Sequence, residues 1–407
     1  MTILDALSFM LKGDKSERKT IEAAFNVMVD AGKIAKIVKE KGVAGLKNIQ
    51  PEPGIPIRPS LAERLPTAEK ILEKVGKKVI VEPKYDGFRC QLHLWKEGGE
   101  KKVSIFSRNL ESTTHMFPDL VTASKKLSVD EAIFDGEAIA YDLINDKFLP
   151  FQETIQRKRK HGIEDMVIKV PLKLFIFDIL YKDGKGLLEI PFSERRKILE
   201  GIIPERGEKI EITRQDIVDD PDKIRDLIKK YLSEGLEGAL IKKIDAPYKA
   251  GARGYHWVKY KKTTDKSVAD TVDLLVMGVN KGKGRRSGFG SGAFLVGIKD
   301  GDKFKTVSKI GTGLTDEQWR ELNARTKKLK NKNKPEGYMV SKSIEPDMWV
   351  NPSLVVEILA DEITKSPIHT AGLALRFPRL IKFRDEKGPN EATTINELQK
   401  LFEMQKV

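Results

Sequence analysis

The sequence predicts an α+β protein of several domains, with helices first, mixed helices and strands in the middle and a small β-barrel last. Three observations support this order. Apolar residues recur at helical spacing up to residue 42, prolines cluster between residues 51 and 59, and after residue 265 the strands shorten and glycines increase. A chain of 407 residues has room for two or three domains. We expect domains over 1–50, 61–264 and 265–407, joined by a linker over 51–60.

The N-terminal region is predicted to be helical. Residues 15–42 carry apolar side chains near helical spacing, and Gly42 provides a stop signal. The preceding Ile3–Leu11 is expected to belong to the same helical piece. Prolines at positions 51, 53, 56 and 59 exclude a helix or a central strand, which predicts a linker.

The middle domain alternates helices and strands. In the strand predicted over Phe134–Ala140, a period of two places Asp135 and Glu137 on one face. Leu172–Leu180 is apolar on both faces except for Asp178, as in a buried central strand. Further helices are expected over Thr67–Val75, Pro191–Ile202 and Pro221–Glu234, and further strands over Gly238–Lys243 and His256–Lys262.

The last domain has short strands. Asp273–Val279 and Ala293–Lys299 flank a flexible basic loop over 281–288, Asp316–Lys328 is expected to be helical, and Ser353–Leu359 alternates like a strand. Short strands with one helix suit a small barrel such as an OB-fold, with a generic β-sandwich as the alternative.

The charge of the chain points to a polyanionic partner. A net charge of +14 and a pI near 9.4 favour nucleic acid as the binding partner. The alternative is a lysine-rich surface that only keeps the protein soluble. One cysteine excludes internal disulfides and a Cys-rich zinc site. No apolar run approaches the ~20 residues of a membrane span, and the start lacks a basic leader. We therefore expect an intracellular, cytoplasmic protein.

The motif that organises the chain is Glu82-Pro-Lys84-Tyr-Asp-Gly-Phe-Arg89, which lies between an apolar strand and an alternating one. A lysine here can be a solvated charge, a phosphate clamp or a nucleophile. A nucleophilic lysine must be neutral when it attacks, so neighbouring cations such as Arg89 or burial must lower its pKa.

Companion motifs follow this lysine in order. Each has an ordinary structural reading as a turn, a core strand or a charged strand end. Lys259 and Lys261 share a strand face with Trp257, and adjacent like charges cost stability unless they are solvated or bind an anion. The companions are Ser107-Arg-Asn-Leu-Glu111, Asp135-Gly-Glu137, Phe175-Ile-Phe-Asp178, Glu234-Gly-Leu-Glu-Gly238, Trp257-Val-Lys-Tyr-Lys261, and Leu375–Arg379 leading to Phe383–Lys387.

Together, these motifs resemble those of covalent nucleotidyltransferases, and most closely the ATP-dependent DNA ligases of archaeal and eukaryotic type. The resemblance covers residue 55 to the end. It implies an ATP-grasp-like nucleotidyltransferase domain of antiparallel sheets and helices, followed by an OB-fold β-barrel. The single cysteine argues against the NAD-dependent ligases, which carry a Cys-rich zinc module, and there is no Walker A pattern.

The resemblance also implies roles for individual residues, with ATP and Mg²⁺ as cofactors. Lys84 would carry AMP through a phosphoramide bond, Glu82 would recognise adenine and Phe177 would stack on it. Glu137 and Glu237 would hold the metal, with Glu137 alternatively on the ribose. Ribose and phosphates would be contacted by Arg89, Arg108, Arg253, Lys259 and Lys261, while Arg384 and Lys387 would orient pyrophosphate when the last domain closes about a hinge at Thr263–Lys266.

The partner implied by the resemblance is nicked double-stranded DNA, bound by a monomer, with a sliding clamp as a partner of a longer form. Residues 1–50 are expected to be the remnant of a helical DNA-binding domain whose apolar faces have lost most of their partners. Self-adenylation should then be normal, while nick joining should be weak and salt-sensitive. The alternatives are a non-catalytic DNA-binding protein and an RNA-joining or capping nucleotidyltransferase.

Overall fold

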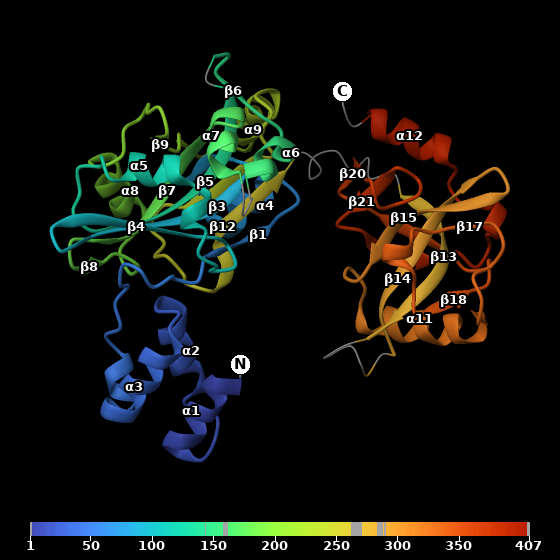
Figure 1. Cartoon of the computed structure of the whole chain (residues 1–407), viewed down its shortest axis with the longest axis horizontal. Coiled ribbons are helices and arrows are strands. Elements are labelled where there is room, and N and C mark those ends of the chain that lie inside the picture. The colour runs from blue at the N-terminus through green and yellow to red at the C-terminus, as the bar shows by residue number, and fades with distance from the viewer. Residues whose placement is uncertain are drawn as a thin grey trace. The chain divides into compact units, whose positions relative to one another are not determined.

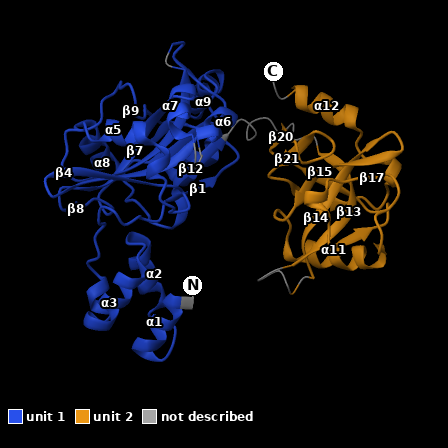
Figure 2. Cartoon of the chain, viewed as in Figure 1, with its two compact units in different colours: residues 1–265 blue, residues 266–407 orange. Residues whose placement is uncertain are grey.

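A computed structural model describes residues 2–142, 144–157, 162–261, 271–282, 288 and 290–404. The chain divides into two compact units, Met1–Asp265 and Lys266–Val407 (Figure 2). Within the described ranges, no helix is long and apolar enough to cross a membrane.

The first unit begins with helices α1 (Thr2–Lys12), α2 (Arg18–Val27) and α3 (Ala31–Lys41) (Figure 1). The prediction of one continuous helix over 15–42 was wrong. Met28 is extended, and the Asp30 side chain accepts a hydrogen bond from the Lys33 amide at 2.9 Å, so it caps a new helix. The apolar faces pack on one another around a cluster of Leu4, Leu7, Ile21, Ala24, Ile34, Val38 and Leu46, while Ile3, Phe9 and Met10 of α1 remain exposed.

The Pro-rich segment over 51–60 contains a turn at residues 53–55 and docks against strand β3 (Phe88–Glu97). The Ile57 amide donates to Gln91 Oε1 at 2.7 Å, and Gln91 Nε2 donates back to the Ile57 carbonyl at 3.0 Å. The Gly54 amide donates to His93 Nδ1 at 3.1 Å. Ile57 is fully buried. Side chains of β3 thus satisfy backbone groups that the prolines leave without a strand partner.

Two sheets form the body of the first unit. We call one the lysine sheet; its strands run in the order β1 (Leu61–Arg64), β12 (Arg253–Lys261), β11 (Gly238–Lys243), β2 (Val79–Lys84), β10 (Asp216–Val218). The other is the facing sheet, with strand order β4 (Glu100–Phe106), β3, β5 (Ala132–Asp142), β7 (Leu172–Lys182), β8 (Lys185–Gly186). The short strands β6 (Lys147–Phe148) and β9 (Ile210–Ile212) pair with β5 and β7.

Helices cover the outer face of each sheet. On the lysine sheet, α4 (Ala68–Val75) and α9 (Pro221–Ser233) share an apolar core with Val79, Val81 and Val258. On the facing sheet, the corresponding core includes residues from α5 (Pro118–Ser124), α7 (Ile163–Lys169) and α8 (Phe192–Glu200). Because strand side chains alternate, Glu82 and Lys84 of β2 point away from α4 and α9, toward the facing sheet.

The chain crosses from one sheet to the other directly after Lys84. The sequence predicts a turn at Asp86-Gly87, and the two strands that this turn joins, β2 and β3, belong to different sheets. Gly87 is needed at the crossing, since a Cβ there would lie 2.2 Å from the Ala138 carbonyl oxygen. The crossing therefore puts Lys84 at the end of β2, where the chain leaves one sheet for the other.

The second unit is a curled sheet with helices α11 (Asp316–Lys328) and α12 (Ile395–Met404) at its two ends (Figure 1). Its shape is that expected of an OB-fold. Helix α12, whose Leu398 and Phe402 enter the core, was missed in the sequence. The strand order is β16 (Lys330–Asn331), β18 (Met348–Val350), β13 (Val272–Lys281), β14 (Ser291–Asp300), β15 (Lys303–Ile310), β17 (Tyr338–Met339). Strand β19 (Val355–Leu359) pairs with β13 and β22 (Arg379–Phe383), and β20 (Glu362–Lys365) pairs with β21 (Leu373–Arg376).

Candidate active site

Strand register brings the predicted residues of the lysine sheet together. Glu82 on β2 lies opposite Leu240 on β11, which lies opposite Lys259 on β12. Lys259 in turn lies opposite Arg64 on β1. Gly238 is the partner of Lys84 in the same register, and it carries no side chain. One face of this sheet therefore presents a carboxylate, the candidate nucleophile and a row of cations.

Lys84 contacts the loop before β11 in two ways. Its ammonium forms an ion pair with the Glu237 carboxylate, and its carbonyl accepts a hydrogen bond from the Glu237 amide at 3.0 Å. About a quarter of the side chain, 26%, is exposed. Burial lowers the pKa of Lys84; Arg108 and Arg89 lower it further, while Glu137 and Asp86 act in the opposite direction. The neutral amine form of Lys84 is therefore more favoured in this site than it would be in bulk water.

Cations gather around this lysine. Burial is the main cause that lowers the pKa of Lys259, and the charges of Lys84, Arg253, Arg108 and Arg64 lower it further. Arg108 is exposed on a turn in which the Ser107 amide donates to the Glu111 carbonyl at 2.9 Å. Mutual repulsion among these groups is relieved by an anion, so the arrangement suits a polyphosphate. Sequence analysis missed Arg64, because this residue lies in no recognisable motif. It joins the cluster of cations only because β1 pairs with β12.

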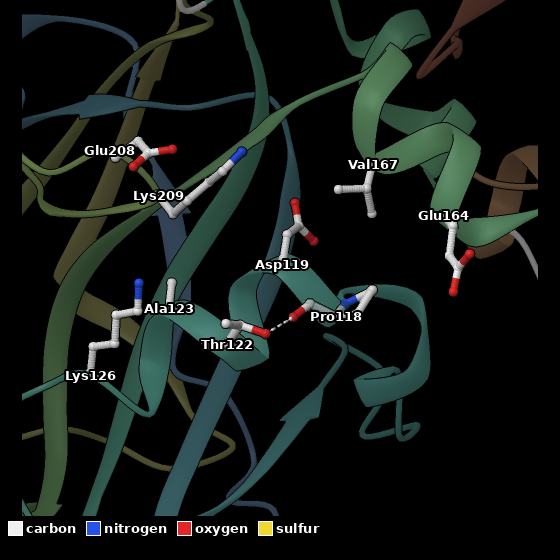
Figure 3. Close-up of a pocket in the computed structure, with 9 residues that line it drawn as sticks. All are labelled: Pro118, Asp119, Thr122, Ala123, Lys126, Glu164, Val167, Glu208 and Lys209. Atoms are coloured by element: carbon white, nitrogen blue, oxygen red, sulfur yellow. Dashed lines mark hydrogen bonds between the residues drawn. The ribbon is translucent and has the colours of Figure 1, made fainter.

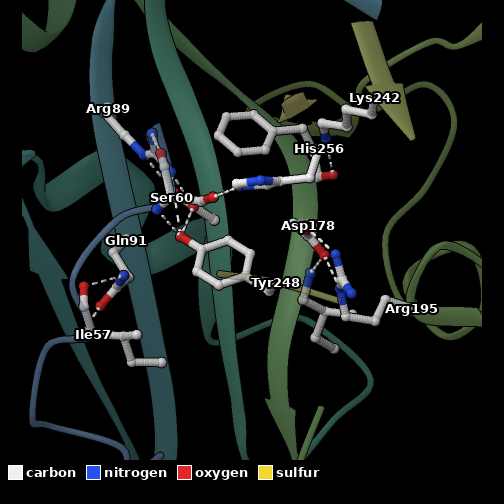
Figure 4. A network of polar contacts seen from close by, with 12 residues as sticks. Ile57, Ser60, Arg89, Gln91, Asp178, Arg195, Lys242, Tyr248 and His256 are labelled. Carbon is white, nitrogen blue, oxygen red and sulfur yellow. Dashed lines mark hydrogen bonds and ion pairs between the residues drawn. The ribbon is translucent and has the colours of Figure 1, made fainter. Parts of the chain in front are cut away.

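Arg89 is anchored by a network that the sequence did not reveal (Figure 4). Its Nη2 and Nε bind the two oxygens of buried Asp135 at 2.5 and 3.0 Å. The Tyr248 hydroxyl donates to the same carboxylate at 2.8 Å. The guanidinium carbon lies 5.6 and 5.5 Å from the ring centroids of Phe177 and Trp257. Arg89 is therefore fixed between the two sheets.

The carboxylate of Glu137 lies on β5, opposite Arg89. Burial raises the pKa of Glu137 to about 7, against the opposing effect of Lys84 and Arg89. Both Glu137 and Glu237 lie near Lys84, because the charge of Glu137 raises the pKa of Lys84 and the carboxylate of Glu237 forms an ion pair with it. Across the described ranges, no group of three or more His, Cys, Asp or Glu side chains could hold a metal ion. A metal here would take most of its ligands from phosphate and water, as Mg²⁺ commonly does.

Lys242, another residue that the sequence analysis did not single out, contacts both Glu82 and Phe177. Lys242 Nζ lies 2.8 Å from Glu82 Oε2 and donates to the Phe177 carbonyl at 3.0 Å. The other carboxylate oxygen, Glu82 Oε1, is buried and has no hydrogen-bond partner among the described residues. The neighbouring Asp178 is fully engaged with Arg195 at 2.7 and 2.9 Å, which gives it a structural role in the core.

Arg384 and Lys387 lie on the second unit. Both bind Asp273, Arg384 Nη1 at 3.0 Å and Lys387 Nζ at 2.6 Å, and Arg384 also contacts Glu357 at 3.1 Å. The predicted hinge Thr263–Lys266 and most of the basic loop fall outside the described residues, and so does the side chain of Lys261.

A separate cavity of about 430 Å³ lies beside α5 and α7 (Figure 3). Charged side chains of both signs line it, among them Asp119, Lys126, Glu164 and Lys209. None of its lining residues is a predicted site residue, and it lacks the convergent cations found around Lys84.

A part-buried lysine between two sheets, followed by a curled-sheet unit, is the arrangement expected of a nucleotidyltransferase of the ligase type. The model of the ATP dependent DNA ligase domain matches residues 59–261, and that of the ATP dependent DNA ligase C terminal region matches residues 285–387. The chain belongs to the ATP-dependent DNA ligases, enzymes that seal nicks in DNA.

Individual proteins agree with this assignment. The probable DNA ligase of Dictyoglomus turgidum is 49% identical over all of this chain and 70% of its own length. The DNA ligase of Hyperthermus butylicus is 41% identical over 99% of this chain and 67% of its own length. A solved structure described as Pmar-Lig_PreS3 is similar in fold, with a TM-score of 0.56 and 23% identity over 87% of this chain and 71% of that one.

Proposed function

We propose that Lys84 is the nucleophile that carries AMP. Its Nζ attacks the α-phosphorus of ATP, an N–P bond forms, pyrophosphate leaves and the amine loses its proton to water. An oxygen of the 5′-phosphate at a nick then attacks the same phosphorus and frees Lys84. Finally the 3′-hydroxyl attacks the 5′-phosphate, and AMP leaves. The observation that carries this proposal is a partly buried lysine of lowered pKa among converging cations.

The surrounding residues supply binding and orientation in this proposal. Arg108, Arg253 and Lys259 would bind the phosphates, and Lys261 would join them. Arg89 would present its guanidinium to the ribose and α-phosphate from the position fixed by Asp135. The orphaned oxygen of Glu82 would accept a hydrogen bond from the adenine amino group, with Phe177 as the ring beside the base. Each assignment uses a group whose charge or free lone pair fits that part of ATP.

We infer that Mg²⁺ is held by Glu137 and Glu237 together with the nucleotide phosphates. The raised pKa of Glu137 and the ion pair of Glu237 with Lys84 both describe carboxylates that a divalent cation would stabilise. When bound, the metal would neutralise charge that develops on the phosphates. Glu137 can instead accept a hydrogen bond from a ribose hydroxyl.

The second unit would complete the first chemical step. Arg384 and Lys387 would leave Asp273 and orient pyrophosphate when that unit closes over the nucleotide. The substrate would be nicked duplex DNA inside the cell, held largely by contacts of this +14 chain with DNA phosphates. We expect a monomer, with a sliding clamp as a partner of a longer form.

Incubation with α-labelled ATP and Mg²⁺, followed by denaturing electrophoresis, tests the proposal. The label should remain on the protein after denaturation and be released by acid, as a phosphoramide requires. Lys84→Ala should abolish labelling, while Lys78→Ala, an exposed lysine just before β2, should retain it. Label on the Lys84→Ala protein would overturn the assignment.

A further inference from the structure

Lys242 is a buried cation at the proposed base site. Its side chain has no exposed surface, and its Nζ lies 4.9, 4.3 and 4.7 Å from the ring centroids of Phe177, Phe192 and Trp257. An ammonium group in such surroundings is costly unless a counter-charge accompanies it. The counter-charge is Glu82, 2.8 Å away and itself 1% exposed.

The two carboxylate oxygens of Glu82 differ in their hydrogen bonding. Oε2 is engaged by Lys242, while Oε1 is buried without a hydrogen-bond partner in the described part of the chain. Burial raises the pKa of Glu82, and the charges of Lys242 and Arg196 oppose that rise; burial also lowers the pKa of Lys242, and the charges of Glu82 and Asp178 oppose that fall. An ionised carboxylate can only accept hydrogen bonds, whereas a protonated one can also donate. Lys242 therefore influences whether Oε1 of Glu82 can only accept a hydrogen bond from a ligand or can also donate one.

We propose that Lys242 is a specificity-determining positioning residue, which holds Glu82 as a pure acceptor so that the site takes 6-amino purines and rejects 6-oxo purines. The inference deepens the proposed function, because it assumes that the base of ATP faces Glu82. Adenine offers an amino donor at position 6, and hypoxanthine and guanine offer a carbonyl acceptor there. Against an ionised Glu82 that carbonyl would meet a second acceptor, with no proton between them.

Transfer from ATP and from inosine triphosphate to Lys84 gives the direct test. The readout is the ratio of kcat/KM for the two nucleotides, measured as labelled protein. Lys242→Met removes the charge and lets Glu82 become protonated, so the ratio should fall by about tenfold or more. Lys243→Met is the matched control, because its exposed side chain is next in β11 and points to the other face; its ratio should equal that of the unaltered chain.

A second variant guards against loss of folding. Lys242→Gln keeps N–H donors for Glu82 and the Phe177 carbonyl but carries no charge, and it should lower the ratio in the same direction. In a Glu82→Gln background the carboxylate is already gone, so adding Lys242→Met should change the ratio no further.

Two failures can be told apart. If the unaltered chain takes no label from ATP, the proposed function fails. If it is labelled, and both Lys242 variants lose rate equally with the two nucleotides so that the ratio is preserved, Lys242 serves only the structure and this inference is overturned.

Discussion

Lys84 and Glu237 are joined twice, although 153 residues separate them in the chain. The hydrogen bond between their backbones, 3.0 Å long, fixes the loop before β11 against the end of β2. The contact between their side chains holds the ammonium in place. A lysine must be neutral to attack phosphorus, so this second contact has to open when the nucleotide reacts. If Lys84 is the nucleophile that we propose, Glu237 restrains it before the nucleotide reacts.

Lys84→Arg should abolish self-adenylation as completely as Lys84→Ala. A guanidinium keeps its proton at any working pH and cannot attack, even though its charge matches that of lysine. Incorporation of α-labelled ATP measures the effect, with Lys78→Arg as the control at an exposed position. Measurable labelling of the Lys84→Arg protein would show that another residue is the nucleophile.

The rate of adenylation should rise with pH as Lys84 loses its proton, and two substitutions should move this profile in opposite directions. The charge of Glu137 raises the pKa of Lys84, and that of Arg108 lowers it. Glu137→Gln should therefore shift the midpoint to lower pH, and Arg108→Gln to higher pH. Single-turnover labelling across the pH range measures both midpoints independently of the maximal rates. A shift of both midpoints in one direction would contradict this electrostatic account.

Arg384→Ala should separate the steps of the reaction. If Arg384 orients pyrophosphate, its loss should slow self-adenylation by about a hundredfold or more. Sealing of a nick that already carries AMP needs no pyrophosphate and should continue. Lys382→Ala, which removes a more exposed cation two residues earlier, is the control. Equal losses in both assays would mean that Arg384 serves folding, through Asp273 and Glu357, or DNA binding.

The Asp178–Arg195 pair should matter for stability. Neither side chain has any exposed surface, so removing one partner leaves a buried charge unpaired. We expect Arg195→Met to lower the free energy of unfolding by about 3–5 kcal/mol. Lys197→Ala on the same helix breaks only an exposed pair with Glu194 and should cost less than about 1 kcal/mol. Urea unfolding compares the two, and similar losses would refute the buried-pair argument.

Local patterns were enough to predict the α+β class, the curled C-terminal sheet and the helices α4, α8, α9 and α11. The family membership followed from the order of the motifs. The predicted helix over 15–42 failed because Asp30 can cap a new helix, and a capping side chain competes with continuous helix in a way that apolar spacing does not show.

The parts of the site that were missed depend on pairing between distant segments. Arg64 lies beside Lys259 only through the pairing of β1 with β12. Tyr248 binds Asp135, 113 residues away in the chain, and Lys242 meets Glu82 only because β11 and β2 share a sheet. No short motif encodes such contacts, since Arg64, Tyr248 and Lys242 each look like an ordinary strand or loop residue in the sequence.

The lysine sheet has a consequence for when the enzyme becomes reactive during synthesis. Its edge strand β1 pairs with β12, and Ser60 meets His256 across 196 residues of chain. Contacts of such sequence separation form late, because the intervening chain must first be brought together. As translation proceeds, Lys84 emerges well before Glu237 and Lys259, and until they arrive it is an ordinary solvated amine. If Lys84 is the nucleophile that we propose, its surroundings are complete only once the chain has emerged through β12, and a shorter nascent chain is expected not to react with ATP.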